Sequence, residues 1–229
     1  MKISVFIITL ILSLNVSAQE IIYNLSDFKS LSVIGNFEVE IIQSDRNVAV
    51  VDINNEEEVK KDNILFTYAA EKLTIKYQGS FIKDIEIKIR IYYANTIQEI
   101  EAKRGVQIRV ENAGKFTEKT VFKAENGGKL LIKNIEATEV SAEISKGGSI
   151  RISGKADSFI AKIVAGGTIG GKDLEAKLVN AKVNMGGEIT CNPLESLLAQ
   201  VTSGGSIHYI GKPKLVDKKV TLGGNIDKL

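Results

Sequence analysis

Pairs of adjacent glycines recur through the C-terminal half of this chain, and they constrain its fold more than any other feature. The pairs are Gly127 and Gly128, Gly147 and Gly148, Gly166 and Gly167, Gly186 and Gly187, Gly204 and Gly205, and Gly223 and Gly224. Successive pairs lie 20, 19, 20, 18 and 19 residues apart. Because a nearly constant period with glycine at one phase is typical of a stacked solenoid, the sequence predicts an architecture and not a reaction.

Apolar residues alternate with polar residues on both sides of each glycine pair. Counted from the first glycine, the third residue before the pair is apolar in every repeat, and so is the third residue after it. The residues after the pair are Leu130, Ile150, Ile169, Ile189, Ile207 and Ile226. Alternation with a period of two indicates half-buried strands. Each repeat is therefore predicted to contain a strand, a glycine corner, a second strand and a return loop.

One such repeat cannot bury its own inner face, whereas repeats stacked about 4.8 Å apart pair every strand with its equivalents above and below. The predicted fold class is all-β, a β-helix-like solenoid with an N-terminal β cap. Corner glycines are expected to be structural, because a sharp bend with positive φ and crowded neighbours excludes a side chain. With a degenerate coil around Gly105, residues 97–229 are expected to form about seven coils of 18–22 residues, continuous with residues 19–96.

Residues 1–18 are predicted to be a cleaved signal peptide. Lys2 is followed by a short apolar run, and Val16, Ser17 and Ala18 are typical of a signal-peptidase site. The run is shorter than the ~20 residues that a membrane-spanning helix needs, although an uncleaved anchor is the alternative. We expect export to the periplasm, cell surface or extracellular space, with no membrane span after cleavage. The single cysteine, Cys191, allows no intramolecular disulfide.

Residues 19–96 lack the glycine period but carry strand-like patterns. The expected strands are Ser32 to Ile34, Glu38 to Ile42, Val48 to Ile53, Ile64 to Tyr68, Leu73 to Tyr77 and Ile85 to Tyr92. The charged stretch 54–62 fits a short helix or a loop, and the loop is favoured. This region is expected to cap the first coil. At the other end, Lys218 and Lys228 replace inward apolar residues, which favours a polar cap, with an interface as the alternative.

The sequence segment 28–43, the charged stretch 54–62 and the later Gly-Gly-x-Ile coils resemble the putative auto-transporter adhesin head GIN domain family of bacterial exported proteins. The resemblance covers nearly the whole chain after residue 18. It implies a right-handed β-helix-like protein with an adhesive or surface role, and it brings no catalytic residues. The pair Gly105 and Val106 departs from the doubled glycine of later coils.

No catalytic residue, metal ligand or cofactor is predicted. Cys191 and His208 lie about one coil apart, but strand alternation sends the thiol inward and the imidazole outward. Neither a G-x-S-x-G elbow, a phosphate-binding loop nor a calcium-binding repeat is present. Acidic residues do not gather at one phase of adjacent coils, which disfavours a carbohydrate-active enzyme, a reading that rests on fold analogy alone.

A column of outward residues offers a candidate ligand site. It lies four residues before each glycine pair and consists of Lys123, Glu143, Lys162, Lys182, Gln200 and Lys219. Lys162 and Lys182 are expected to stack one strand spacing apart, where like charges repel unless they are solvated or bridged by an anion. This pair is the candidate for binding an acidic glycan or a lipid phosphate, and a merely solvated face is the alternative.

These features favour a non-enzymatic, exported, adhesin-like interaction module of the cell envelope. A self-associating envelope scaffold, which would be a homo-oligomer, and a carbohydrate-active enzyme on a β-helix are the alternatives. The expected partners are cell-surface glycans or envelope components. Nucleic acid is not expected, because the formal net charge is only +2 and the acids and bases are interspersed.

Overall fold

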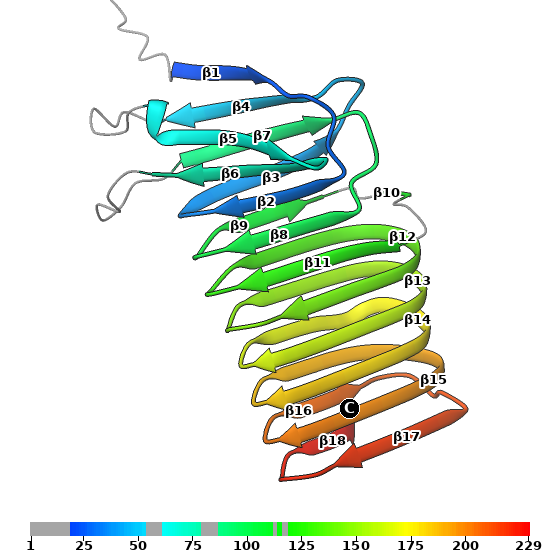
Figure 1. Ribbon diagram of the computed structural model, residues 1–229. Helices are drawn as coiled ribbons and strands as arrows, with labels where there is room; N and C mark the ends of the chain where they lie inside the picture. The colour runs from blue at the N-terminus through cyan, green and yellow to red at the C-terminus, as the bar shows by residue number, and fades with distance from the viewer. Residues whose placement is uncertain (1–18, 54–60, 79–86, 112–113, 116–118) are drawn as a thin grey trace, which may run out of the picture.

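The computed structural model describes residues 19–53, 61–78, 87–111, 114–115 and 119–229, and there it is built almost entirely of strands stacked along one axis (Figure 1). The N-terminal elements are β1 (Gln19–Asn24), β2 (Ser30–Ile34), β3 (Phe37–Gln43), β4 (Val48–Ile53), the 3-10 helix η1 (Lys61–Asn63), β5 (Ile64–Ala69), β6 (Lys72–Tyr77) and β7 (Ile87–Tyr93). The predicted signal peptide at residues 1–18 lies outside the described residues.

The solenoid continues through elements of increasing length. They are β8 (Glu99–Lys103), β9 (Gln107–Val110), β10 (Gly114–Lys115), β11 (Lys119–Glu125), β12 (Lys129–Ile144), β13 (Ser149–Ala165), β14 (Thr168–Met185), β15 (Glu188–Ser203), β16 (Ser206–Tyr209), β17 (Leu215–Val220) and β18 (Asn225–Lys228). The long strands β12 to β15 each bend, so that the first part lies in one face of the solenoid and the second part in the other (Figure 1).

Two stacked sheets result, and we name them by their position relative to the corner. Sheet A contains the strands that enter the glycine corners, in the order β5, β6, β2, β8, β11, β12, β13, β14, β15, β17. Sheet B contains the strands that leave them, in the order β1, β4, β7, β3, β9, β12, β13, β14, β15, β16, β18. Among the described strands, the antiparallel pairings are β5 with β6, β4 with β7 and β1 with β4, and the other pairings are parallel.

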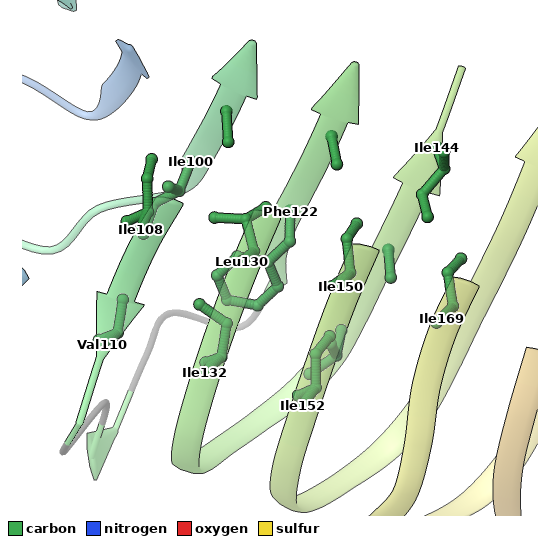
Figure 2. Close-up of a cluster of buried hydrophobic side chains, with 14 of the residues drawn as sticks. Ile100, Ile108, Val110, Phe122, Leu130, Ile132, Ile144, Ile150, Ile152 and Ile169 are labelled. Atoms are coloured by element: carbon green, nitrogen blue, oxygen red, sulfur yellow. The ribbon is translucent and has the colours of Figure 1, made fainter. Parts of the chain in front are cut away.

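Equivalent residues of successive coils stack in register and fill the space between the sheets. Ile150 pairs with Ile169, Ile169 with Ile189, and all three side chains are fully buried. Figure 2 shows part of this column, with Ile108, Leu130, Ile150 and Ile169 on neighbouring strands. The structure forms a β-solenoid of about six turns, and the predicted all-β solenoid fold is confirmed.

The corners require glycine for two different reasons. At Gly166 (φ +64°) an added Cβ would meet open space, so only the positive φ excludes other residues. At Gly167 (φ +105°) an added Cβ would lie 2.8 Å from the carbonyl oxygen of Gly148 in the preceding coil. The earlier corner at Val106 differs, because there the positive φ values fall on Arg104 and Gly105. Val106 can therefore carry a side chain, which is buried.

The N-terminal coils do not stack in the order of the chain. β2 lies between β6 and β8 in sheet A, and β3 lies between β7 and β9 in sheet B. The chain thus forms a first coil from β2 and β3 and stacks a second coil, from β6 and β7, on the side nearer β1. It then returns to the other side of the first coil with β8 and β9 (Figure 1). All six strands expected in this region are present within a few residues, whereas β1 was not predicted. Within the charged stretch, residues 54–60 lie outside the described part, and η1 follows them.

The two ends of the solenoid differ. At the N-terminal end, the rings of Tyr23 on β1 and Phe66 on β5 stack with centroids 4.4 Å apart and join the outermost strands of the two sheets. At the C-terminal end, Lys218 turns its ammonium group toward the carbonyl oxygen of Ile226, 3.0 Å away, and over the ring of Tyr209. Lys228 is exposed. The charge of Lys218 is thereby satisfied at an open end instead of being buried in the core.

Candidate ligand-binding site

The predicted lysine pair stacks as expected on the outer face of sheet A. Lys162 on β13 pairs in register with Lys182 on β14. The neighbour on the other side of Lys162 is Glu143, and their side chains form an ion pair of 2.9 Å. Since Glu143 already neutralises Lys162, the two lysines present less uncompensated positive charge than the sequence pattern indicates. Ligand binding at this pair stays a prediction.

Cys191 and His208 do not form a nucleophile and base pair. Cys191 stacks on Tyr209 inside the solenoid, whereas His208 stacks on Thr190 at an outward position. The thiol lies 3.7 Å from the backbone carbonyl oxygen of His208 and not against its imidazole. Burial raises the pKa of the Cys191 thiol from 9.0 to about 12, so the thiolate that a nucleophile needs is suppressed. The predicted opposite orientation of the two side chains is confirmed.

A charged cleft lies on the outer face of sheet B, where β4, β7, β3 and β9 run side by side. Its volume is about 430 Å³. The lining residues are Glu38, Val39, Glu40, Asp52, Lys88, Ile89, Arg90, Gln107, Arg109 and Glu111. Most of these side chains occupy alternate positions of their strands, because the intervening residues point into the core. We call this feature the charged cleft.

Charges of both signs alternate across the charged cleft. Glu40 on β3 lies in register between Arg90 on β7 and Arg109 on β9. Arg90 forms an ion pair of 2.5 Å with Glu20 on β1. Arg109 is exposed and forms no ion pair with any residue that the structure describes. The charged cleft therefore presents one guanidinium group that is available to an anion.

The charged cleft also contains an acceptor without a donor. One carboxylate oxygen of Asp52, Oδ1, is buried and has no hydrogen-bond partner among the described residues. Buried polar atoms are seldom left unpaired, because the desolvation cost is then uncompensated. A hydroxyl group would supply the missing donor, and the Arg109 guanidinium would bind a carboxylate or a phosphate through two parallel hydrogen bonds.

Sequence reasoning did not find the charged cleft. The sequence does show charged or polar residues at alternate positions in three short segments, Glu38 to Glu40, Lys88 to Arg90 and Gln107 to Arg109. They come together only because β3 lies between β7 and β9, and nothing in the glycine period indicates that order. Within the described part of the chain, no group of three or more His, Cys, Asp or Glu residues is arranged to hold a metal ion. None of its helices has the length and apolar character needed to cross a membrane.

Comparison with known families confirms the resemblance seen in the sequence. The family described as "Putative auto-transporter adhesin, head GIN domain" matches residues 27–213. The match spans the N-terminal coils, the charged cleft and most of the glycine corners. A comparison with curated proteins found no match.

Several solved structures share this fold. A putative adhesin from Bacteroides fragilis is 22% identical, with a TM-score of 0.80, and the alignment covers 93% of this chain and 98% of that one. A putative lipid binding protein from Parabacteroides distasonis is 19% identical, with a TM-score of 0.70 and coverage of 94% and 98%. A putative adhesin from the same species is 18% identical, with a TM-score of 0.70 and coverage of 92% and 96%. At these identities the likeness shows the fold alone.

Proposed function

Because the chain belongs to the adhesin-like head GIN domain family, we propose that it is an exported, non-enzymatic surface module that binds an acidic glycan in the charged cleft. The observation that carries the proposal is the presence in one cleft of the unpaired Arg109 guanidinium and the unpartnered Asp52 Oδ1. An acidic sugar carries both complementary groups, a carboxylate and several hydroxyls. The cleft volume lies within the range of ~300–1,000 Å³ that is usual for small-ligand sites.

The scaffold supports this role through rigidity. Every strand that lines the charged cleft pairs on both sides, so the lining residues other than Glu111 are held on a regular sheet and not on loops. A preorganised polar surface loses little conformational freedom on binding. A single shallow contact of this kind binds weakly, and adhesion then depends on several copies being displayed together.

Binding to glycan arrays tests the proposal, followed by titration calorimetry with an acidic oligosaccharide and with its neutral counterpart. We expect the wild-type protein to bind the acidic form only. Arg109→Ala removes the group that meets the carboxylate, so it should weaken binding at least tenfold, and Asp52→Asn should weaken it less. Both effects should shrink at high salt, because exposed charges are screened.

The double variant Lys162→Ala, Lys182→Ala is the matched control, since it also removes positive charge from the solenoid surface. If the ligand binds in the charged cleft, this variant should bind like the wild type. Binding that is lost in this variant and retained in Arg109→Ala would move the ligand to the lysine pair. Failure of the wild type to bind any acidic glycan would overturn the proposed ligand class. Export is tested separately by N-terminal sequencing of the mature protein, which is expected to begin at Gln19.

A further inference from the structure

The C-terminal end of the solenoid exposes an unpaired strand edge and part of the core. In the described chain, β17 pairs with β15 only, and all six of its residues are exposed. Val216 and Val220 occupy inward columns, directly beyond the buried Leu197 and Val201. They are nevertheless 43% and 45% exposed, because no further coil covers them. Such an edge favours the addition of another strand.

The free backbone groups of β17 belong to a defined set of residues. The amide of Thr221 donates to the carbonyl oxygen of Val201, 3.0 Å away. In a parallel ladder, alternate residues of a strand bond to the same neighbour. The odd-numbered residues of β17 therefore bond to β15, whereas Val216, Lys218 and Val220 direct their N–H and C=O groups toward the free edge.

We propose that β17 pairs with the β17 strand of a second copy of the chain, antiparallel, about a twofold axis through Lys218. In this register Asp217 of each copy faces Lys219 of the other on the outer surface. Val216 of each copy faces Val220 of the other on the inner side, over the open core. The segment from Val216 to Val220 is thus complementary to itself in charge and in apolar character.

Neighbouring registers are less favourable. A twofold axis through Asp217 places the two Asp217 carboxylates against each other, and an axis through Lys219 opposes two ammonium groups. The same twofold axis would cross sheet B near Ile226 on β18, because the Lys218 side chain reaches from sheet A to the carbonyl oxygen of Ile226. There Asn225 of one copy would face Asp227 of the other. An isologous pair of this kind closes on itself and does not propagate.

Lys218 lies on the proposed axis and limits the affinity. Two copies bring two Lys218 side chains together, and each is compensated only by the Ile226 carbonyl oxygen and the Tyr209 ring of its own copy. We therefore expect a dimer of modest affinity. This inference does not depend on the proposed glycan site, although dimerisation would join two charged clefts in one particle.

Sedimentation over a range of protein concentrations tests the inference with a charge exchange. Asp217→Lys and Lys219→Asp should each weaken dimerisation at least tenfold, since each places like charges opposite one another. The double variant Asp217→Lys, Lys219→Asp should restore it, because the exchange recreates the pairs with reversed signs. Lys218→Val should tighten the dimer. Lys129→Asp, which changes an exposed lysine on β12, several strands away from this end, should sediment like the wild type.

A wild-type protein that stays monomeric up to millimolar concentration would overturn the proposal. A double variant that fails to regain the wild-type dissociation constant would exclude this register. Particles that grow without limit would indicate head-to-tail stacking of coils and would equally reject the closed pair. Because β17 is wholly exposed in the monomer, these variants should fold, and circular dichroism spectra that match the wild type are the check.

Discussion

The two glycines of each corner carry different constraints, although they look alike in the sequence. Gly166 needs only a positive φ, whereas Gly167 also approaches the backbone of Gly148 and a side-chain carbon of Ile144, 2.9 Å from where its Cβ would lie. Stacking brings each second glycine against the coil before it, so the contact repeats at Gly187 and Gly205. The sequence predicts the bend, and only the stacked structure separates the two roles.

We therefore predict unequal costs for alanine at one corner. Gly166→Ala should lower the free energy of unfolding by about 1 kcal/mol, the cost of a left-handed residue with a Cβ. Gly167→Ala should lower it by about 3 kcal/mol, because overpacking against a fixed backbone adds to that strain. Urea denaturation monitored by circular dichroism measures both. Equal losses in the two variants would contradict the proposed backbone contact.

At the scale of elements, a buried carboxylate links three strands that are far apart in the sequence. Glu101 on β8 accepts hydrogen bonds from Ser32 on β2, from Lys72 on β6 and from Lys103 on its own strand, over 2.9, 3.1 and 2.9 Å. Burial alone would raise the pKa of Glu101, but the hydrogen bonds from these donors outweigh it and lower the pKa below 4.5. The group therefore stabilises the junction between the out-of-order coils.

Glu101→Gln should lower the unfolding free energy at pH 7 by about 1–3 kcal/mol, since three donors lose a charged acceptor. A carboxylate whose pKa is lowered on folding contributes stability above the unfolded-state value, and this is lost as the pH falls through the folded-state value. The wild type should therefore lose more stability than the variant between pH 7 and acid pH. Glu143→Gln breaks a more exposed pair and should cost less than about 1 kcal/mol.

The strands of the N-terminal region could be predicted, but their order could not. Local alternation indicates β2 and β3, because it depends only on neighbouring residues. Their position between earlier and later coils depends on long-range pairing, such as Ser30 with both Lys72 and Glu99, which leaves no local period. The lysine pair, predicted within a regular repeat, was placed correctly in register. The charged cleft was missed because it arises from the non-sequential part.

At the scale of the whole molecule, stability should decline toward the C-terminal end. Central strands such as β13 and β14 are paired on both sides, and their inward residues are fully buried. β17 and β18 each have one neighbour and enclose an open core. In a linear stack of repeats, local stability reflects the neighbours of each repeat, so a terminal coil opens before the interior.

Hydrogen exchange measures this gradient. In dilute solution the amides of β17 should exchange at least tenfold faster than those of β14. Raising the protein concentration should protect the Val216, Lys218 and Val220 amides if two copies pair there, and it should leave β14 unchanged. Protection of β17 equal to that of β14 in dilute monomer would show that the end is stabilised without a partner.

The interleaved N-terminal coils have a consequence for how the chain assembles during synthesis. β2 cannot acquire its two neighbours until residues near Lys72 and Glu99 have emerged, so the first coil made waits for both. A strictly sequential solenoid could add each rung as it leaves the ribosome or the translocation channel. Here β2 waits about forty residues for its first neighbour, β6, and some seventy for its second, β8, which makes it the stretch most in need of a chaperone.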